Sequence, residues 1–312
     1  MSIIVTGSMA FDHIMDFPGY FKDHILPDKV HMLNVSFLVN SLKRQRGGCA
    51  ANIAYNLALL QERPTIMATV GTDFGEYREW LENNGVDTSS LKVIDDEFTA
   101  SAFVTTDKSD NQITGFYPGA MSYADQLSFR DLQAGAVDMA IISPNNPAAM
   151  AKYAVECSEL GIPYIFDPGQ QVVSLTPESL VEGARHAKVL IANDYEYEMI
   201  KNKCELGMAD LCRMAEIVIV TLGEEGSEIR TNGDVVRIPP AKAHEVVDPT
   251  GAGDAYRAGV IKGLLRGYDL EKMGRVAGLT AVYALEKYGT SAHHFTLAEF
   301  EERYRENFGE AL

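Results

Sequence analysis

Short apolar runs that alternate with segments of helical period constrain the fold of this chain more than any other feature. The runs are rich in β-branched side chains and nearly continuous, which is typical of parallel strands covered on both faces. Strands are predicted over Ile3–Thr6, Thr65–Val70, Met139–Ile142, Tyr164–Phe166, Val189–Ala192 and Ile217–Thr221. Helices are predicted over Ala50–Leu60, Phe74–Asn83, Pro147–Leu160, Asp194–Lys203, Ala252–Arg266, Leu270–Lys287 and Leu297–Phe308. The alternation predicts an α/β fold with a doubly wound, mostly parallel sheet flanked by helices.

Two stretches, residues 13–46 and 97–119, interrupt this alternation. Both contain aromatic-rich segments without helical period, and FTASAFVTT and NQITGFYP are predicted to form a hairpin around the polar turn KSDN. We interpret the two stretches as one small β-sheet that covers the main domain as a lid. The α/β domain then comprises residues 1–12, 47–96 and 120–312.

Composition disfavours several other classes of protein. The formal net charge of −17 argues against nucleic acid as a partner, because DNA and RNA binding need a basic surface. No apolar run is long enough for a membrane helix and the N-terminus is predicted to be a strand, so no membrane association and a cytoplasmic location are expected. The four scattered cysteines disfavour a disulfide framework or a zinc site. Adjacent His293 and His294 are interpreted as part of a loop or helix start.

The string Asp248-Pro-Thr-Gly-Ala-Gly-Asp254-Ala-Tyr-Arg-Ala-Gly259 carries the strongest chemical signal. Gly251, Ala252 and Gly253 allow a tight turn with bare amides, and an apolar helix follows at once. The unpaired N–H groups and the positive dipole end of such a helix form an anion site. Asp254 in the first turn can cap the helix and can also act as a base. A short G-x-G-D is more often a simple capped turn, but the full string is a far more specific pattern.

This string resembles the C-terminal signature of the ribokinase-like, or phosphofructokinase-B, family of kinases. The resemblance implies a kinase that uses ATP and Mg²⁺. It also implies that Gly251, Ala252 and Gly253 form an anion hole for the transferring phosphoryl group. Asp254 would then remove the proton from the acceptor hydroxyl.

Two N-terminal motifs resemble the substrate-binding part of the same family. In Gly47-Gly48-Cys-Ala-Ala-Asn52 the glycines permit close approach of the backbone to a ligand, and Asn52 lies one turn into a helix. The segment Gly7-Ser8-Met-Ala-Phe-Asp12 directly follows the first strand. The resemblance implies that these motifs bind sugar hydroxyls, with Asp12 accepting hydrogen bonds from ribose. A packed helix start and a turn-capping Asp12 are the structural alternatives.

Two further motifs follow predicted strands in the order that the family shows. Asn193-Asp-Tyr-Glu196 resembles the N-x-x-E motif, which implies that Asn193 lies at the nucleotide site and that Glu196 supports Mg²⁺ through water. A capped helix start explains the same residues, and both interpretations can hold together. Thr221-Leu-Gly223-Glu-Glu-Gly226 resembles the T-L-G-x-x-G loop at the nucleotide site.

Three segments resemble a bacterial branch of adenosine kinases within this family and favour a nucleoside over a free sugar. They are Leu33-Asn-Val-Ser36-Phe, Phe116-Tyr-Pro-Gly-Ala-Met121 and Phe166-Asp-Pro-Gly-Gln170-Gln171. By this resemblance, Ser36, Gln170 and Gln171 meet the polar edge of the purine. Phe103 and Phe116 lie in the two predicted lid strands and are expected to face one another, with the base stacked against them. Simple packing of the lid is the alternative for the two rings.

The predicted reaction is phosphorylation of the 5'-hydroxyl of adenosine by ATP, giving AMP and ADP. A ribose, fructose, inosine or guanosine kinase of the same family, and a non-catalytic nucleoside sensor, are the alternatives. A P-loop kinase is excluded because the chain has no Gly-Lys dipeptide. A dinucleotide-dependent oxidoreductase is disfavoured because the first strand leads to Gly7-Ser-Met-Ala and not to G-x-G-x-x-G. A supporting K⁺ ion, as in some relatives, and a homodimer formed through the lid are left open by the sequence.

Overall fold

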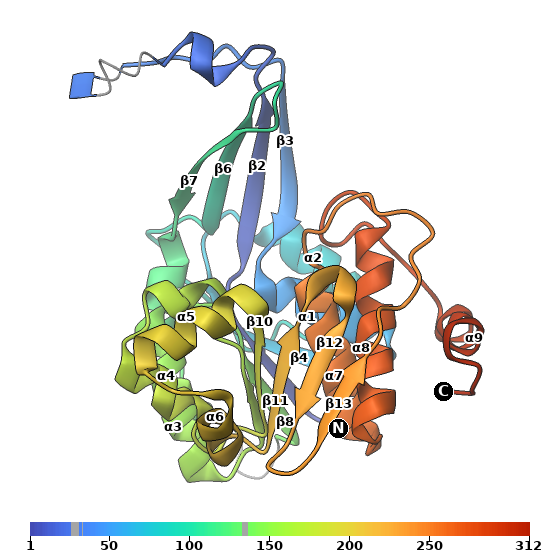
Figure 1. Cartoon of the computed structure of the whole chain (residues 1–312). Coiled ribbons are helices and arrows are strands. Elements are labelled where there is room, and N and C mark those ends of the chain that lie inside the picture. Colours follow the sequence, from blue (N-terminus) through green and yellow to red (C-terminus); the bar gives the residue numbers. More distant parts are fainter. Residues whose placement is uncertain (26–30, 33, 133–136) are drawn as a thin grey trace.

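A nine-stranded sheet forms the centre of the molecule. The computed structural model describes residues 1–25, 31, 32, 34–132 and 137–312. The strand order is β13-β12-β11-β10-β9-β8-β1-β4-β5 (Figure 1). The strands are β1 Ile3–Thr6, β4 Pro64–Val70, β5 Leu91–Val93, β8 Met139–Ile142, β9 Tyr164–Phe166, β10 Val189–Asn193, β11 Ile217–Thr221, β12 Ser227–Arg230 and β13 Val235–Ile238. Only the pairings that involve β12 and β13 are antiparallel among these strands, so the predicted mostly parallel sheet is confirmed.

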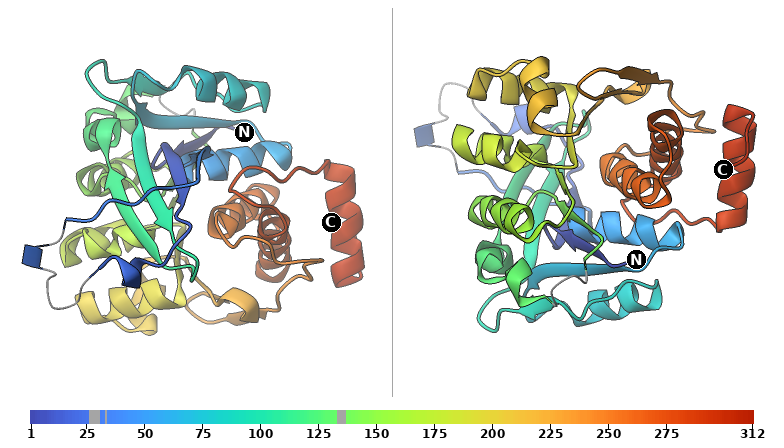
Figure 2. Two further views of the ribbon diagram at one scale, coloured as in Figure 1. Left: turned by 90° about the horizontal axis from the view of Figure 1, so that it is seen from above. Right: turned by 90° about the horizontal axis from the view of Figure 1, so that it is seen from below.

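Helices cover both faces of this sheet, as the two views along it show (Figure 2). One face carries α1 Cys49–Leu59, α2 Gly75–Asn83, α7 Ala252–Arg266 and α8 Leu270–Leu285, and the other carries α3 Pro147–Leu160, α4 Pro177–Ala184, α5 Asp194–Cys204 and α6 Met208–Met214. Helix α9 Leu297–Phe308 packs outside α8. Short 3-10 turns are η1 Phe21–Asp23, η3 Gly119–Gln126, η4 Phe129–Asp131, η5 Gly169–Val173 and η6 Gly223–Glu225. None of the described helices is long and apolar enough to cross a membrane.

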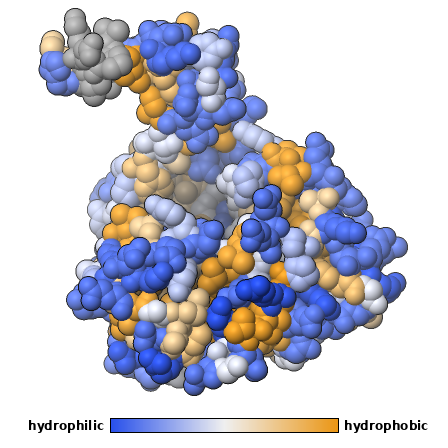
Figure 3. Space-filling view, in the orientation of Figure 1, coloured by the Kyte–Doolittle hydropathy of each residue, from blue (hydrophilic) through white to orange (hydrophobic). Residues whose placement is uncertain are grey.

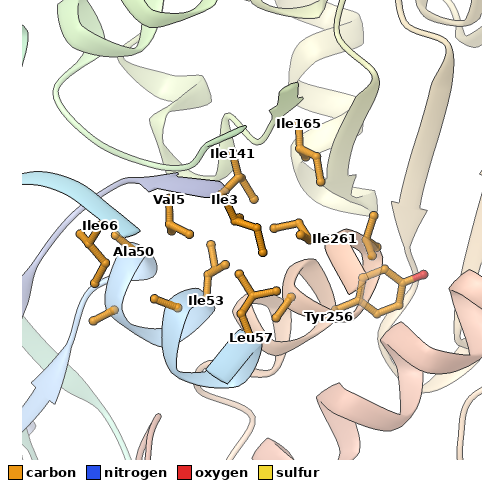
Figure 4. Packing of buried hydrophobic residues seen from close by; sticks show 14 of the residues in the cluster. Ile3, Val5, Ala50, Ile53, Leu57, Ile66, Ile141, Ile165, Tyr256 and Ile261 are labelled. Atoms are coloured by element: carbon orange, nitrogen blue, oxygen red, sulfur yellow. The ribbon is translucent and has the colours of Figure 1, made fainter. Parts of the chain in front are cut away.

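The core is split by the sheet into two layers because successive strand residues point to opposite faces. Ile3 and Val5 of β1 pack against α1 and α7, whereas Ile4 packs on the side of α3. Figure 4 shows Ile53 and Leu57 of α1 in the first of these layers, close to β1. Burying such side chains contributes about 1.5–3 kcal/mol each, so α1 and α7 are held firmly beneath the sheet.

The lid is a four-stranded sheet with the order β3-β2-β6-β7 (Figure 1). Its strands are β2 Ala10–Asp16, β3 Ser41–Gly47, β6 Ala100–Thr106 and β7 Gln112–Tyr117. The predicted hairpin is confirmed as the antiparallel β6–β7 pair, and β2 runs parallel to β6. Strand β2 already begins at Ala10, within the 1–12 segment expected in the main domain, because only three residues separate it from β1. Leu33 of the lid motif lies outside the described residues.

The elements that the sequence did not predict are short. They are β5, the hairpin β12–β13, α4 and α6. Strand β5 has three residues and α6 has seven, too few for a periodic signal to develop. The ends of the predicted elements shift by one or two residues; α8, for example, ends at Leu285 rather than at Lys287.

Candidate active site

The first turn of α7 presents backbone amides that no side chain caps. Gly251 lies in the left-handed region at φ 82° and is the N-cap. A Cβ at this position would lie 3.1 Å from the Cβ of Thr290, so glycine also permits close packing there. The Asp248 carboxylate holds the turn by accepting hydrogen bonds from the N–H groups of Thr250 and Gly289, each over 2.9 Å. Because the helix N–H groups beside Ala252 and Gly253 lack a capping side chain, this turn can bind an anion.

Asp254 and Asn52 meet where α7 and α1 begin. The Nδ2 of Asn52 donates a hydrogen bond to the Oδ2 of Asp254 over 2.8 Å. Asn52 is buried, and its Oδ1 has no partner among the described residues. A buried oxygen of this kind is available to a hydroxyl donor of a ligand.

The Asp254 carboxyl has the electrostatics of a general base. Burial raises its pKa to about 6, and the nearby Asp167 carboxylate adds to this effect. Hydrogen bonding by Asn52 and the positive charge of Arg257 act in the opposite direction, and the Cys49 thiol also favours the charged form. A carboxylate with a pKa just below neutral is ionised at physiological pH and can still accept a proton readily.

A buried ion pair stands behind the same turn. Arg257 donates to both carboxylate oxygens of Asp167, over 2.5 Å from Nε and 2.7 Å from Nη2. Its Nη1 also donates to the carbonyl oxygen of Gly253 over 3.1 Å. Although burial alone would lower it, the pKa of Arg257 is raised by Asp167. Arg257 therefore ties the expected anion hole to the end of β9.

The substrate motifs form one packed corner beneath the lid. Ser8 accepts a hydrogen bond from the Cys49 N–H over 3.1 Å. A Cβ on Gly48 would lie 2.4 Å from the Ser8 carbonyl oxygen, and one on Gly47 would lie 2.4 Å from the Oδ2 of Asp12. Backbone atoms therefore require glycine at position 48, whereas a side chain at position 47 would displace the Asp12 carboxylate. Burial raises the pKa of Asp12. Figure 3 shows a hollow in the molecular surface at the base of the lid.

The two motifs predicted to bind the nucleotide lie side by side at the ends of neighbouring strands. Asn193 of β10 is the partner of Thr221 in β11. Asn193 and Glu196 form a reciprocal capping box, with hydrogen bonds of 2.7 and 2.8 Å. Burial raises the pKa of Glu196, while the hydrogen bond from the Asn193 N–H opposes the rise. Gly223 and Gly226 shape the loop after β11 at φ 58° and 89°, and the Leu222 N–H donates to the Gly226 carbonyl oxygen.

The lid register separates the two predicted aromatic residues. Phe116 is in register with Ala102, which is in register with Asp12, so Phe116 and Asp12 share one face of the lid. Phe103 is one residue further along β6 and points to the opposite face, where its ring stacks on His13 at 4.7 Å. The expectation that Phe103 and Phe116 face one another is therefore wrong. Whether two residues of a hairpin lie on the same face depends on the register of the two strands, and the sequence alone did not define that register.

The remaining predicted residues are less closely associated with this corner. Ser36 is exposed and lies beyond the distal ends of β2 and β3, next to Phe37, which packs on Phe17. Gln170 is exposed and Gln171 is half-buried on η5, directly after the buried Asp167. The structure thus brings Asp12, Asn52 and Asp254 to one end of the main domain and leaves Ser36 at the tip of the lid.

Sequence reasoning missed three polar residues behind the site. Asp167 lies in the Phe166–Gln171 segment. Arg257 lies one helical turn after Asp254, and this spacing could have indicated that Arg257 lies near the site. His293 is buried and its Nε2 lies 2.8 Å from the Oδ1 of Asn56, whereas His294 is exposed. Across the part of the chain that the structure describes, no group of three His, Cys, Asp or Glu side chains is placed to hold a metal.

Comparison with known proteins identifies this arrangement. Residues 5–295 match the pfkB family of carbohydrate kinases. The chain belongs to this family. It is 34% identical over 313 residues to a nucleoside kinase of Methanothermobacter thermautotrophicus, covering 98% of this chain and 96% of that relative. The predicted family and fold are confirmed, and the chain is an ATP-dependent kinase.

Solved nucleoside kinases share the fold over nearly the whole chain. The nucleoside kinase of Burkholderia thailandensis in complex with inosine superimposes with a TM-score of 0.89 at 33% identity, covering 99% of both chains. The same enzyme in complex with ADP-inosine gives a TM-score of 0.86 at 35% identity, covering 99% of this chain and 97% of that one.

Proposed function

We propose that this pfkB kinase transfers the γ-phosphoryl group of ATP to the 5'-hydroxyl of adenosine, giving AMP and ADP. The observation that carries the proposal is the shared lid face of Asp12 and Phe116. A carboxylate accepts hydrogen bonds from ribose hydroxyls, and a ring on the same face can stack on the attached base. A free sugar would use only the first of these contacts. The nucleoside kinases among the relatives support the same substrate class.

In this proposal Asp254 accepts the proton of the 5'-hydroxyl as the oxygen attacks the phosphorus. The amides of Gly251, Ala252 and Gly253 stabilise the charge on the transferring group. Asn52 holds the Asp254 carboxylate in place and offers its free Oδ1 to a ribose hydroxyl, beside Gly47, Gly48 and Ser8. The pKa of Asp254, about 6, keeps this base ionised at neutral pH.

Magnesium is part of the proposal because ATP brings several negative charges to an acidic chain. Mg²⁺ is usually held by one or two carboxylates, water and the phosphates rather than by a complete protein cage. The half-buried Glu196 supplies one such carboxylate beside Asn193, so the residues fit a water-mediated ion. Thr221, Gly223 and Gly226 would line the nucleotide.

Inosine is the second candidate substrate. The solved neighbour that was crystallised with inosine is 33% identical over nearly the whole chain. Adenosine and inosine differ at the polar edge of the purine, so Gln170, Gln171 and Ser36 are the residues proposed to discriminate between them. Ribose recognition by Asp12 and stacking on Phe116 would be the same for both nucleosides.

We also propose that the outward face of the lid packs against a second copy of the chain. Leu42, Phe103 and Ile113 share that face and are 64%, 44% and 44% exposed. Exposed apolar side chains on a sheet face are typical of an interface. Leu42→Lys and Ile113→Lys should convert a dimer to a monomer in sedimentation experiments. A monomeric wild type would contradict this part of the proposal.

The experiment that tests the function is a coupled ADP-release assay on the purified chain. Adenosine, inosine, guanosine, ribose and fructose are compared with Mg²⁺-ATP, with the product identified by mass. We expect the largest specificity constant for adenosine. A preference for inosine would select the second candidate, and a preference for a free sugar would contradict the role of Phe116. If none of the five substrates leads to ADP release, the result would indicate a non-catalytic sensor.

A further inference from the structure

A chain of hydrogen bonds leads from the site into the core of the main domain. Asn56 lies one turn after Asn52 in α1, and its Nδ2 donates to the Asn52 carbonyl oxygen over 2.9 Å. The Oδ1 of Asn56 lies 2.8 Å from the Nε2 of His293. Asn56 and His293 are 0% and 1% exposed. Buried polar groups seldom persist without a role, because each must be hydrogen-bonded to offset the cost of burial.

Two groups that can only accept, the Asp254 carboxylate and the backbone carbonyl of Asn52, fix the direction of these hydrogen bonds. The ionised Asp254 carboxylate can only accept, so Asn52 must turn its NH2 group towards it. The backbone carbonyl oxygen of Asn52 can only accept as well, so Asn56 donates to it and turns its own Oδ1 to His293. His293 is therefore assigned a proton on Nε2. Burial lowers the pKa of His293 to about 4, and the neighbouring His294 adds to this effect, so the ring is neutral.

The segment that carries His293 also contacts the other parts of the site. Gly289 donates to Asp248 behind the anion-binding turn, and the Thr290 hydroxyl donates to the Arg46 carbonyl oxygen in β3 over 3.0 Å. The Tyr55 hydroxyl donates to the His293 carbonyl oxygen over 2.6 Å. The segment between α8 and α9 is thus fixed to α1, to the lid and to the turn before α7.

We propose that His293 is a positioning residue for phosphoryl transfer, which acts through Asn56 and the first turn of α1 to hold Asn52 against Asp254. The proposal rests on the kinase function proposed above. His293 does not contact the Asp254 carboxylate itself. Its effect depends on the Asn56 amide, whose orientation it sets, and on the backbone of Asn52, from which the Asn52 side chain reaches Asp254. This distinguishes it from a residue that merely fills the core.

The measurable consequence is a change in the proton affinity of Asp254. The ionisable groups that act on Asp254 are Arg257 on its own helix, Asp167 at the end of β9 and Cys49 on α1. None of these is altered when His293 is changed. The bond from Asn52 lowers the pKa of Asp254, so a variant that lets Asn52 turn away should raise that pKa.

The test compares His293→Leu with the wild type across a pH series of turnover at saturating Mg²⁺-ATP and nucleoside. His293→Leu keeps the bulk and removes the donor. We expect the acid midpoint of the rate profile to move upward by about one unit, so that turnover falls about tenfold on the acid side and much less above neutral pH. His293→Gln keeps a hydrogen-bond donor at this position, so its acid midpoint should lie close to that of the wild type. His294→Leu changes the exposed neighbour and should match the wild type.

Two further measurements keep the proposal open to refutation if a variant is unstable or inactive. Tyr55→Phe removes an anchor of the same segment but leaves the ring on Asn56, so it should lower thermal stability without moving the midpoint. The carboxyl ¹³C signal lost in Asp254→Asn reports the pKa of Asp254 without any turnover. If that signal titrates identically in wild type and His293→Leu, the positioning role is refuted even if the protein proves not to be a nucleoside kinase. If the wild type releases no ADP with any nucleoside, the proposed function fails separately.

Discussion

The side chains of Asn52 and Asp254 are joined by a 2.8 Å hydrogen bond although the residues are 202 positions apart in the chain. Asn52 lies in the first turn of α1, shortly after the lid strand β3, and Asp254 lies in the first turn of α7. The proposed substrate side and the proposed phosphate side of the site therefore share one contact, carried by two helices that pack under the same sheet (Figure 4).

Asp254→Asn should abolish most of the activity. It keeps the shape of the side chain and removes its basicity, so we expect turnover to fall by about 10²–10⁴ with little change in nucleoside affinity. The wild-type rate should decline below about pH 6, where Asp254 becomes protonated. Steady-state kinetics over a pH series test both points. Near-normal turnover of a folded variant would contradict the assignment.

The same substitution should change the pH dependence of stability. The pKa of Asp254 is raised by burial from 3.8 to about 6, so the protonated carboxyl favours the folded state. That contribution is present below about pH 4 and is lost as the pH rises through about 6. Asp254→Asn cannot ionise and should gain up to about 3 kcal/mol over the wild type across this window. Urea unfolding on both sides of the window measures the difference; a gain that does not vary with pH would exclude this explanation.

Glu196→Gln should raise the Mg²⁺ concentration needed for half-maximal rate. The amide keeps the capping geometry with Asn193 but removes the charge that is expected to act on the ion through water. Glu198→Gln is the matched control, because Glu198 lies on the same helix and pairs with exposed Lys201. Titration of Mg²⁺ at fixed ATP distinguishes the two variants. An equal metal requirement in all three proteins would limit Glu196 to a capping role.

Phe116→Ala and Phe103→Ala form a matched pair on opposite faces of the lid. Loss of a stacked ring should weaken adenosine binding by about 1–3 kcal/mol in Phe116→Ala. Any activity on free ribose should change much less, since ribose does not reach that ring. Phe103→Ala should leave the adenosine-to-ribose ratio of specificity constants unchanged. If Phe103→Ala changed this ratio more than Phe116→Ala does, the base would bind on the face of Phe103, and the proposed role of Phe116 would be contradicted.

Arg257→Met should destabilise the chain strongly. It leaves the buried Asp167 carboxylate without its bidentate partner, at a cost of about 3–5 kcal/mol in the free energy of unfolding. The double variant Arg257→Met with Asp167→Asn should recover much of this loss. Lys201→Met breaks an exposed pair and should cost less than about 1 kcal/mol. Denaturant unfolding at neutral pH compares the three.

Local signals in the sequence were sufficient for the main sheet and for the glycine-rich turn at the start of α7. Buried strands such as β8 have continuous apolar runs, and the turn before Asp254 is defined by consecutive small residues. Contacts between distant segments were not predictable in the same way. The bonds of Arg257 to Asp167 and of His293 to Asn56 depend on how helices and loops pack, and neither leaves a periodic trace. The lid register was likewise undetermined, since a one-residue shift fits the same alternation.

The register of the lid also bears on how substrate preference can evolve. Two rows of cross-strand neighbours share the lid face of Asp12. The first row consists of Gln45, Asp12, Ala102 and Phe116, and the second consists of Lys43, Ile14, Val104 and Thr114. Single substitutions at Ala102, Val104 or Thr114 would reshape the proposed base pocket while Asp254 and its turn stay unchanged. A one-residue insertion within β7 would instead exchange its two faces and present Tyr117 or Ile113 to the substrate. Gradual change of specificity is therefore open to this scaffold by point mutation, whereas small insertions in this hairpin should be purged by selection.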